Sequence, residues 1–92
     1  MIKVSKARSG TATVTFAIPA DLHDGPVSVV GDFNGWTPGA TPLVRRWNGT
    51  RSAKISVGPG RFEFRYLGAG GAWLDEPEAP ERAGDNAVLV VA

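Results

Sequence analysis

The stretch TATVTFAI, Thr11–Ile18, places an apolar residue at every second position. The apolar positions are Ala12, Val14, Phe16 and Ile18, and threonine fills three of the four positions that alternate with them. Successive side chains of a β-strand point to opposite faces of its sheet. This period of two therefore predicts a strand that buries one face.

Five other segments have a strand-like composition and are separated by turn residues. They are PVSVVGDF (26–33), PLVRRW (42–47), TRSAKISV (50–57), RFEFRYL (61–67) and NAVLVV (86–91). Turn signals recur about every 8 to 12 residues, which is typical of β-sandwiches, and no window has a helical period. The sequence predicts an all-β sandwich rather than a parallel α/β fold, with the phenylalanines and the tyrosine in core or sheet packing.

The composition is that of one small globular domain, so we expect a single domain over residues 1–92. The chain has 92 residues, of which 42% are hydrophobic and 21% charged, and its net charge is +1. A net charge this small argues against a partner attracted by bulk electrostatics, so no nucleic-acid partner is predicted. The lack of cysteine excludes disulfides and cysteine-ligated zinc.

The first ten residues, MIKVSKARSG, do not have the apolar stretch of a signal peptide because Lys3 and Lys6 interrupt it. No later segment is long and apolar enough to be a membrane span. We therefore expect a cytoplasmic protein with no membrane partner.

Two Asn-Gly dipeptides have different surroundings. Asn48-Gly49 lies between two strand-like segments and predicts a two-residue hairpin turn in which both residues have positive φ. Asn34-Gly35 is followed by WTPGATP, whose prolines disfavour a strand. It predicts a corner that closes a strand and leaves Trp36 on irregular backbone, either as a lid on the core or as a surface platform.

A second tryptophan, Trp73, follows the flexible tip GAGG, and Arg65 lies on the strand before that tip. Two tryptophans at strand ends with an arginine between them favour a flat apolar surface edged by hydrogen-bond donors. Sugar rings present C–H faces that pack on such aromatic planes, and rigid aromatics provide this contact at low entropic cost.

Three segments, VSVVGDFNGW, GPGRFEFRYLGAGGAWLDEPEAP and GDNAVLVV, resemble the family 48 carbohydrate-binding module. This module is the N-terminal domain of isoamylases and glycogen-branching enzymes, and it also occurs in the β subunit of AMP-activated protein kinase. The resemblance runs from about Val27 to Val91 in the family's order. It implies an immunoglobulin-like early-set β-sandwich of about seven antiparallel strands.

The resemblance also implies a site. In family members that bind starch or glycogen, two tryptophans stack on glucose rings, and a lysine and an asparagine bond sugar hydroxyls. By motif position the tryptophans correspond to Trp36 and Trp73, the lysine to Arg65, and the asparagine that opens the last strand to Asn86. The implied function is non-catalytic binding of an α-glucan polysaccharide or oligosaccharide, without a cofactor.

The sequence departs from the family pattern at three places, and the second of them, the shortened connection, favours an alternative function. Arg65 keeps the charge of the family's lysine but presents a planar fork. The connection between Pro80 and Asn86 is shorter than in the kinase subunit and lacks the apolar residue that inserts against a curled glucan. Arg51 stands where many members carry an aromatic that faces the core. The alternative is a protein-interaction domain of the same fold that docks to a glucan-metabolising enzyme.

No residue set predicts an enzyme. Glycoside hydrolysis needs two carboxylates about 5 to 10 Å apart around the scissile bond. Asp75 with Glu76 or Glu78 offers candidates, but all three lie in a Pro-rich loop with no sequence sign of burial. We therefore expect no catalytic residues.

Two other groups are interpreted as structural. His23, Asp21 and Asp24 are residue types that can bind a metal, but we interpret their segment as a solvated connection that holds no metal. Trp47, next to two arginines, is either part of a surface that stacks nucleic-acid bases or a cross-strand packing residue. The small net charge favours packing.

Overall fold

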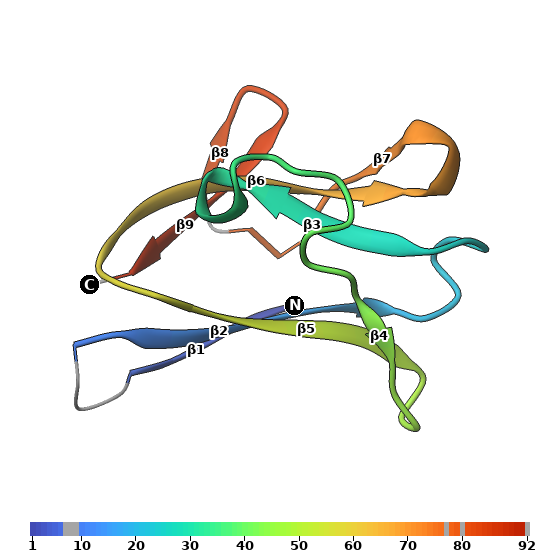
Figure 1. Ribbon diagram of the computed structural model, residues 1–92, viewed down its shortest axis with the longest axis horizontal. Helices are drawn as coiled ribbons and strands as arrows, with labels where there is room; N and C mark the ends of the chain where they lie inside the picture. Colours follow the sequence, from blue (N-terminus) through green and yellow to red (C-terminus); the bar gives the residue numbers. More distant parts are fainter. Residues whose placement is uncertain (7–9, 77, 80, 92) are drawn as a thin grey trace.

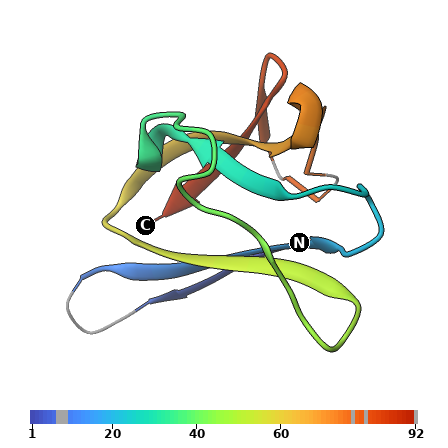
Figure 2. The same cartoon turned by 45° about the vertical axis from the view of Figure 1, so that its right-hand side comes forward.

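The computed structural model describes residues 1–6, 10–76, 78–79 and 81–91, so Ala7–Ser9, Pro77, Pro80 and Ala92 lie outside the described residues. Figures 1 and 2 show two layers of strands that face each other. All pairings within the two sheets are antiparallel, so the predicted all-β sandwich is confirmed. Among the described residues, no helix has the length and apolarity needed to cross a membrane.

The two layers are called sheet A and sheet B. Sheet A, the lower layer in Figure 1, has the strand order β1-β2-β5-β4. Its strands are β1 (Ile2–Lys6), β2 (Ala12–Pro19), β4 (Val44–Arg45) and β5 (Thr50–Val57). Sheet B has the order β3-β6-β9-β8, and β7 also pairs with β6. Its strands are β3 (Val27–Gly31), β6 (Gly60–Gly68), β7 (Ala72–Leu74), β8 (Glu81–Ala83) and β9 (Asn86–Val91).

The described chain has nine strands where about seven were expected, because short edge strands were taken for loops. β7 and β8 have three residues each, too few to show a period of two. Two short 3₁₀ turns, η1 (Asp32–Asn34) and η2 (Ala69–Gly71), follow β3 and β6.

The core lies between the sheets and is centred on Phe16. The apolar positions of the stretch Thr11–Ile18 are at most 2% exposed, as predicted from their alternation. The Phe16 ring is 5.0 Å from that of Phe64 and 6.4 Å from that of Tyr66, both on the facing sheet. These edge contacts between aromatic rings join the two sheets.

Arg51 also points inward, but it serves the loop between β2 and β3 rather than the core. Its side chain is only 3% exposed and donates to the backbone carbonyls of Ala20, His23 and Gly25. The guanidinium group, with its five donors, thus satisfies loop carbonyls that an aromatic ring would leave without partners. His23 is partly buried and packs on Gly68, where an added Cβ would lie 2.8 Å from the imidazole Nε2. Asp21, Leu22 and Asp24 are exposed, as expected of a solvated connection, whereas His23 packs against the sheet.

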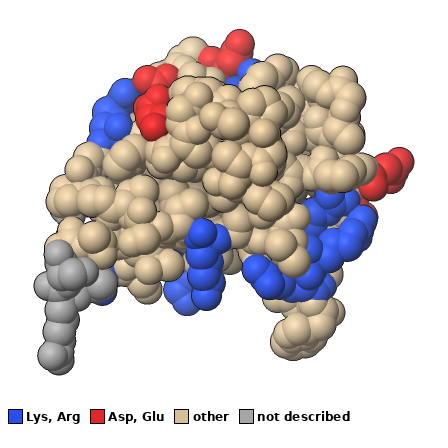
Figure 3. All heavy atoms as spheres, viewed as in Figure 1, with Lys and Arg blue, Asp and Glu red and all other residues tan. Residues whose placement is uncertain are grey.

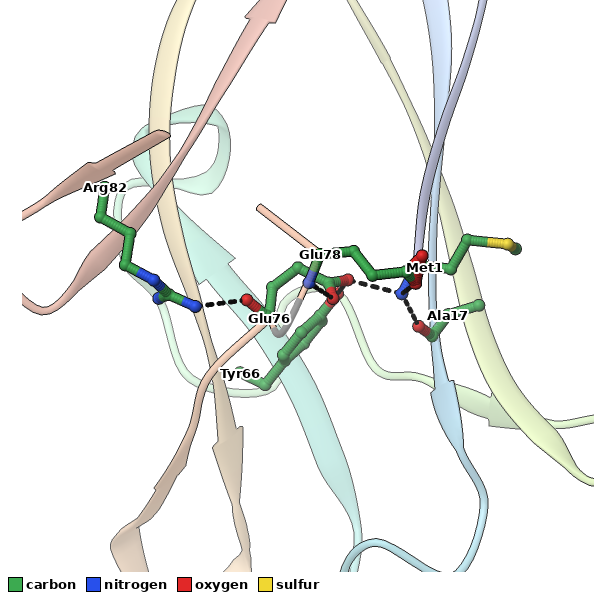
Figure 4. Close-up of polar contacts among 6 residues, drawn as sticks. All are labelled: Met1, Ala17, Tyr66, Glu76, Glu78 and Arg82. Carbon is green, nitrogen blue, oxygen red and sulfur yellow. Dashed lines mark hydrogen bonds and ion pairs between the residues drawn. The ribbon is translucent and has the colours of Figure 1, made fainter. Parts of the chain in front are cut away.

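Glu76 is fully buried, which corrects the expectation that this acidic loop is solvent-exposed. Its carboxylate accepts hydrogen bonds from the Tyr66 hydroxyl at 2.9 Å and the Glu78 backbone N–H at 3.1 Å (Figure 4). The α-ammonium group of Met1 lies 2.6 Å from the same carboxylate and also donates to the Ala17 carbonyl. This network joins β2 of sheet A to β6 of sheet B inside the sandwich.

Because of Tyr66, the fold is expected to lose stability at alkaline pH. Burial raises the pKa of the Tyr66 hydroxyl, and the neighbouring Glu76 carboxylate raises it further. Above about pH 10 the unfolded chain releases this proton while the folded chain retains it, so the free energy of unfolding falls as pH rises. Urea midpoints measured from pH 8 to 11 should show this loss. The loss should be smaller in Tyr66→Phe, and identical pH profiles for the two proteins would contradict the assignment.

Candidate functional site

The corner after β3 is built by Asn34. Its side-chain oxygen accepts from the Gly31 N–H at 3.1 Å, and its amide nitrogen donates to the Val29 carbonyl at 3.0 Å. Gly35 follows with φ +64°, a left-handed conformation that glycine adopts without strain. Asn34-Gly35 therefore closes a strand and is not a hairpin turn, as its sequence context predicted.

The two aromatics of this corner have opposite roles. Phe33 packs against the core, with its ring stacked 5.5 Å from that of Phe16. Trp36 is partly exposed, is not among the described residues that pack on the core, and donates from its indole Nε1 to Asp32 at 3.0 Å. Phe33 is the lid on the core, which leaves Trp36 on the surface.

Trp36 has a strained backbone. Its φ is +58°, and it is the only residue other than glycine with a positive φ among those the structure describes. A bulky side chain in the left-handed region costs free energy and persists only where the surroundings hold it. Here the Trp36 N–H donates to the Gly31 carbonyl at 2.9 Å, and the indole is tied to Asp32. Strain of this kind concentrates at binding and active sites.

Arg65 and Trp73 meet on the outer face of sheet B. Phe64 and Tyr66 face the core, so Arg65 between them points outward. The guanidinium carbon lies 4.8 Å from the centre of the Trp73 ring, and one nitrogen is 3.2 Å from Asp75. Trp73 remains 48% exposed, so Arg65 leaves much of the indole open to solvent.

Glu63 links Asn86 and Trp36, the other two predicted site residues, to β6. It lies two positions before Arg65 on β6, so both side chains are on the outer face. Asn86, the first residue of β9, donates to its carboxylate at 3.1 Å. The Glu63 backbone N–H donates at 2.8 Å to Asp32, which also holds the Trp36 indole.

The structure thus places Arg65, Trp73 and Asn86 on one face of sheet B, and Asp32 links the Trp36 indole to the Glu63 backbone on a strand of that sheet. We call this surface, with Trp36, Arg65, Trp73, Asn86, Asp32, Glu63 and Asp75, the tryptophan face. The sequence reasoning did not include Asp32 or Glu63, and it considered Asp75 only as an acid for catalysis. The spacing of Glu63 and Arg65 on one strand was the available signal for Glu63.

The tryptophan face combines flat apolar area with fixed polar groups. Trp36 and Trp73 present indole surface, while Arg65 and Asn86 supply donors and Glu63 and Asp75 supply acceptors. The Arg65 Nε is buried with no hydrogen-bond partner among the described residues, an energetic cost of the kind found at functional sites.

The two neighbouring acids Asp75 and Glu76 lie in different surroundings. Asp75 is on the outside, with a side chain that is 57% exposed and paired with Arg65. Glu76, the next residue, is fully buried against Tyr66 inside the sandwich. The two carboxylates therefore face opposite sides of the chain and cannot flank one substrate bond.

The connection before Asn86 is a tight hairpin. Ala83 pairs directly with Asn86, so Gly84 and Asp85 alone join β8 to β9. Gly84 has φ +61°, as a two-residue turn requires. Neither turn residue is apolar, and Pro80, where the shortened connection begins, lies outside the described residues.

The second Asn-Gly dipeptide forms a different turn from the one predicted. The Arg46 N–H donates to the Thr50 carbonyl at 2.7 Å, which extends the pairing of β4 with β5 by one residue and leaves a turn of three residues, Trp47 to Gly49. Gly49 has φ +82°, but Asn48 does not have the positive φ that the two-residue turn needs. Trp47 lies at the tip and is 98% exposed, so its predicted packing role is also wrong.

No protein-family model matches the chain. The assignment to the carbohydrate-binding module family is therefore a proposal, and it rests on the motif at Gly31–Trp36 and on the residues of the tryptophan face.

Proposed function

We propose that this protein is a cytoplasmic, non-catalytic α-glucan-binding module with the immunoglobulin-like early-set fold. The observation that carries the proposal is the presentation of Trp36. Its indole is held outside the core by a strained backbone and a hydrogen bond to Asp32, while Phe33 of the same corner packs inside. A structure that only needed to close the core would not require Trp36 in this position.

In the proposed complex, glucose rings of glycogen or starch stack on Trp36 and Trp73. Indole rings offer large, rigid contact area at low entropic cost. The cation above Trp73 is Arg65, whose remaining donors would reach sugar hydroxyls at the rim of the stacked ring. Asn86 would supply the second polar contact, with Glu63 fixing the orientation of its amide. No cofactor or metal enters this mechanism.

The second candidate function is docking to a glucan-metabolising enzyme through the same face. The observation in its favour is the tight hairpin at Gly84 and Asp85, which has no apolar side chain to insert against a curved glucan. Exposed tryptophan and arginine side chains are also the residues that most often dominate protein interfaces.

The experiment that separates the two functions is native gel retardation in glycogen or amylose. We expect retardation in both α-glucans and none in a mannan gel of the same concentration. Equal mobility in all gels would contradict glucan binding and leave protein docking as the function of the tryptophan face.

Purified protein is expected to release no reducing ends from glycogen or starch at any pH where it is folded. The physical reason is the placement of Asp75 outside and Glu76 inside the sandwich, which keeps these two carboxylates from flanking one bond. A reducing-sugar assay checks this. Release that disappears in Asp75→Ala would overturn the non-catalytic assignment.

A further inference from the structure

The outer face of sheet A has a distinct chemical character. Val14 and Phe16 point into the core, so Thr15 between them points outward, and it pairs with Lys3 on β1 and Lys54 on β5. A neighbouring row across the same strands consists of three hydroxyl side chains, Ser5, Thr13 and Ser56. No aspartate or glutamate occurs in any of the four strands of this sheet.

The hairpin between β4 and β5 places an aromatic ring beside these cations. Trp47 lines a shallow hollow of about 400 Å³ together with Arg46, Ser52 and Lys54. Arg46 donates through Nε to the Ser52 hydroxyl at 2.8 Å, which holds its guanidinium group over the sheet. We call the outer surface formed by Lys3, Thr15, Arg46, Trp47, Ser52 and Lys54 the basic face.

Charges are segregated between the two sheets. On sheet B, Arg61 pairs with Glu63 and Glu81, and Arg65 pairs with Asp75. Within the described residues, neither Lys3, Arg46 nor Lys54 is in an ion pair with a carboxylate. Figure 3, viewed as Figure 1, shows basic side chains along the lower side of the molecule and most acidic ones above. The outer surface of sheet A is therefore positive, although the net charge of the whole chain is only +1.

From this arrangement we propose that the basic face binds single-stranded nucleic acid. One base stacks on Trp47, and the neighbouring phosphates contact Arg46, Lys54 and Lys3. Single strands are bound in this way elsewhere, by cations that follow the backbone and aromatic rings that stack unpaired bases. The whole-chain charge argued against such a partner, but a ligand responds to the local charge of the surface it contacts.

The composition of the basic face favours phosphates over an acidic protein. Its arginine and tryptophan also occur at protein interfaces, but lysine and serine, which make up half of this face, are depleted there. Lysine, arginine, serine and threonine are the side chains that commonly contact phosphate oxygens. Lys3, Arg46 and Lys54, which form no ion pair within the described residues, would contribute no charge attraction to a neutral glucan. The basic face is separate from the tryptophan face because the two lie on opposite sheets.

The test is fluorescence anisotropy of a labelled oligothymidylate of about 12 nucleotides, a length within the range that one small domain covers. With about three phosphate contacts, the logarithm of affinity should fall against the logarithm of salt concentration with a slope of about −2. Lys54→Gln should make this slope shallower by about 0.7.

The matched pair of variants is Trp47→Ala and Trp73→Ala, one on each face. Trp47→Ala should weaken binding about tenfold, as loss of one stacked base does, while Trp73→Ala should leave it unchanged. Undetectable binding at low salt, or equal affinity of wild type and Trp47→Ala, would overturn the proposal. So would equally tight binding of an oligoglutamate with the same number of charges, which would assign the basic face to an acidic polypeptide.

The outcome is independent of glucan binding. Saturating maltoheptaose should not change the anisotropy of the bound oligonucleotide, since the two ligands use opposite faces. Displacement of the oligonucleotide by maltoheptaose would contradict the proposal that the two ligands bind at separate sites. Loss of glucan retardation alone would contradict only the function proposed for the tryptophan face.

Discussion

Gly31→Ala is expected to destabilise the fold by about 3 kcal/mol, at the upper end of the usual cost of overpacking. An added Cβ would lie 2.5 Å from the Glu63 carbonyl oxygen, 2.8 Å from the Phe64 Cβ and 2.9 Å from the Phe33 ring. The carbonyl and the Cβ belong to β6, which pairs with both β3 and β9, so neither moves without disturbing the sheet. Urea midpoints measure the loss.

Gly58→Ala is the matched control for Gly31→Ala. A Cβ at Gly58 meets no atom within 4 Å, and the backbone there is not in the left-handed region. The variant should therefore be neutral or more stable by up to about 1 kcal/mol, because alanine restricts the unfolded chain. A change below about 0.5 kcal/mol in Gly31→Ala, the range of neutral surface substitutions, would contradict the close approach of β3 to β6.

Trp36→Ala is expected to abolish glucan retardation with little loss of stability. Truncation of a dominant tryptophan costs at least about 2 kcal/mol of binding, and this corresponds to a loss of affinity of about 30-fold. A buried aromatic would instead cost about 3 to 5 kcal/mol of folding free energy, but Trp36 is outside the core. Trp73→Ala should lose binding similarly, and affinity electrophoresis with urea unfolding measures both effects.

Trp47→Ala is the control for both tryptophan variants. Its ring is 98% exposed at a hairpin tip on the other sheet, so neither glucan binding nor stability should change. Global unfolding of Trp36→Ala would show that the corner is part of the core. Unchanged retardation of Trp36→Ala would remove the principal residue of the proposed site.

The long strands of this fold were predictable because one face of each is buried. Burial in β2 alternates from Ala12 to Phe16, and β5 and β9 have the predicted limits. β1 and β8 were missed because edge strands bury little and need no apolar period. Glu76 was misjudged for a similar reason, since its burial depends on Tyr66 and the α-ammonium of Met1, which are distant in sequence.

Turn chemistry, both at the corner of the candidate site and at the tip of the β4–β5 hairpin, was predictable only where tertiary contacts agreed with it. Asn34-Gly35 forms the expected corner because the prolines that follow exclude a strand. Asn48-Gly49 has the stronger hairpin signal, yet the chain uses a three-residue turn that includes Trp47. Two-residue and three-residue hairpin turns are both common, so the local sequence does not select between them. The register between β4 and β5 selects the three-residue turn.

The most direct test of the tryptophan face is one titration of maltoheptaose into isotopically labelled protein, followed by the indole N–H resonances of its three tryptophans. We predict saturable shifts for Trp36, whose indole N–H is bonded to Asp32, and for Trp73, stacked against Arg65. The Trp47 signal should stay fixed. Absence of shifts, or a shift of Trp47 alone, would contradict α-glucan binding by this face.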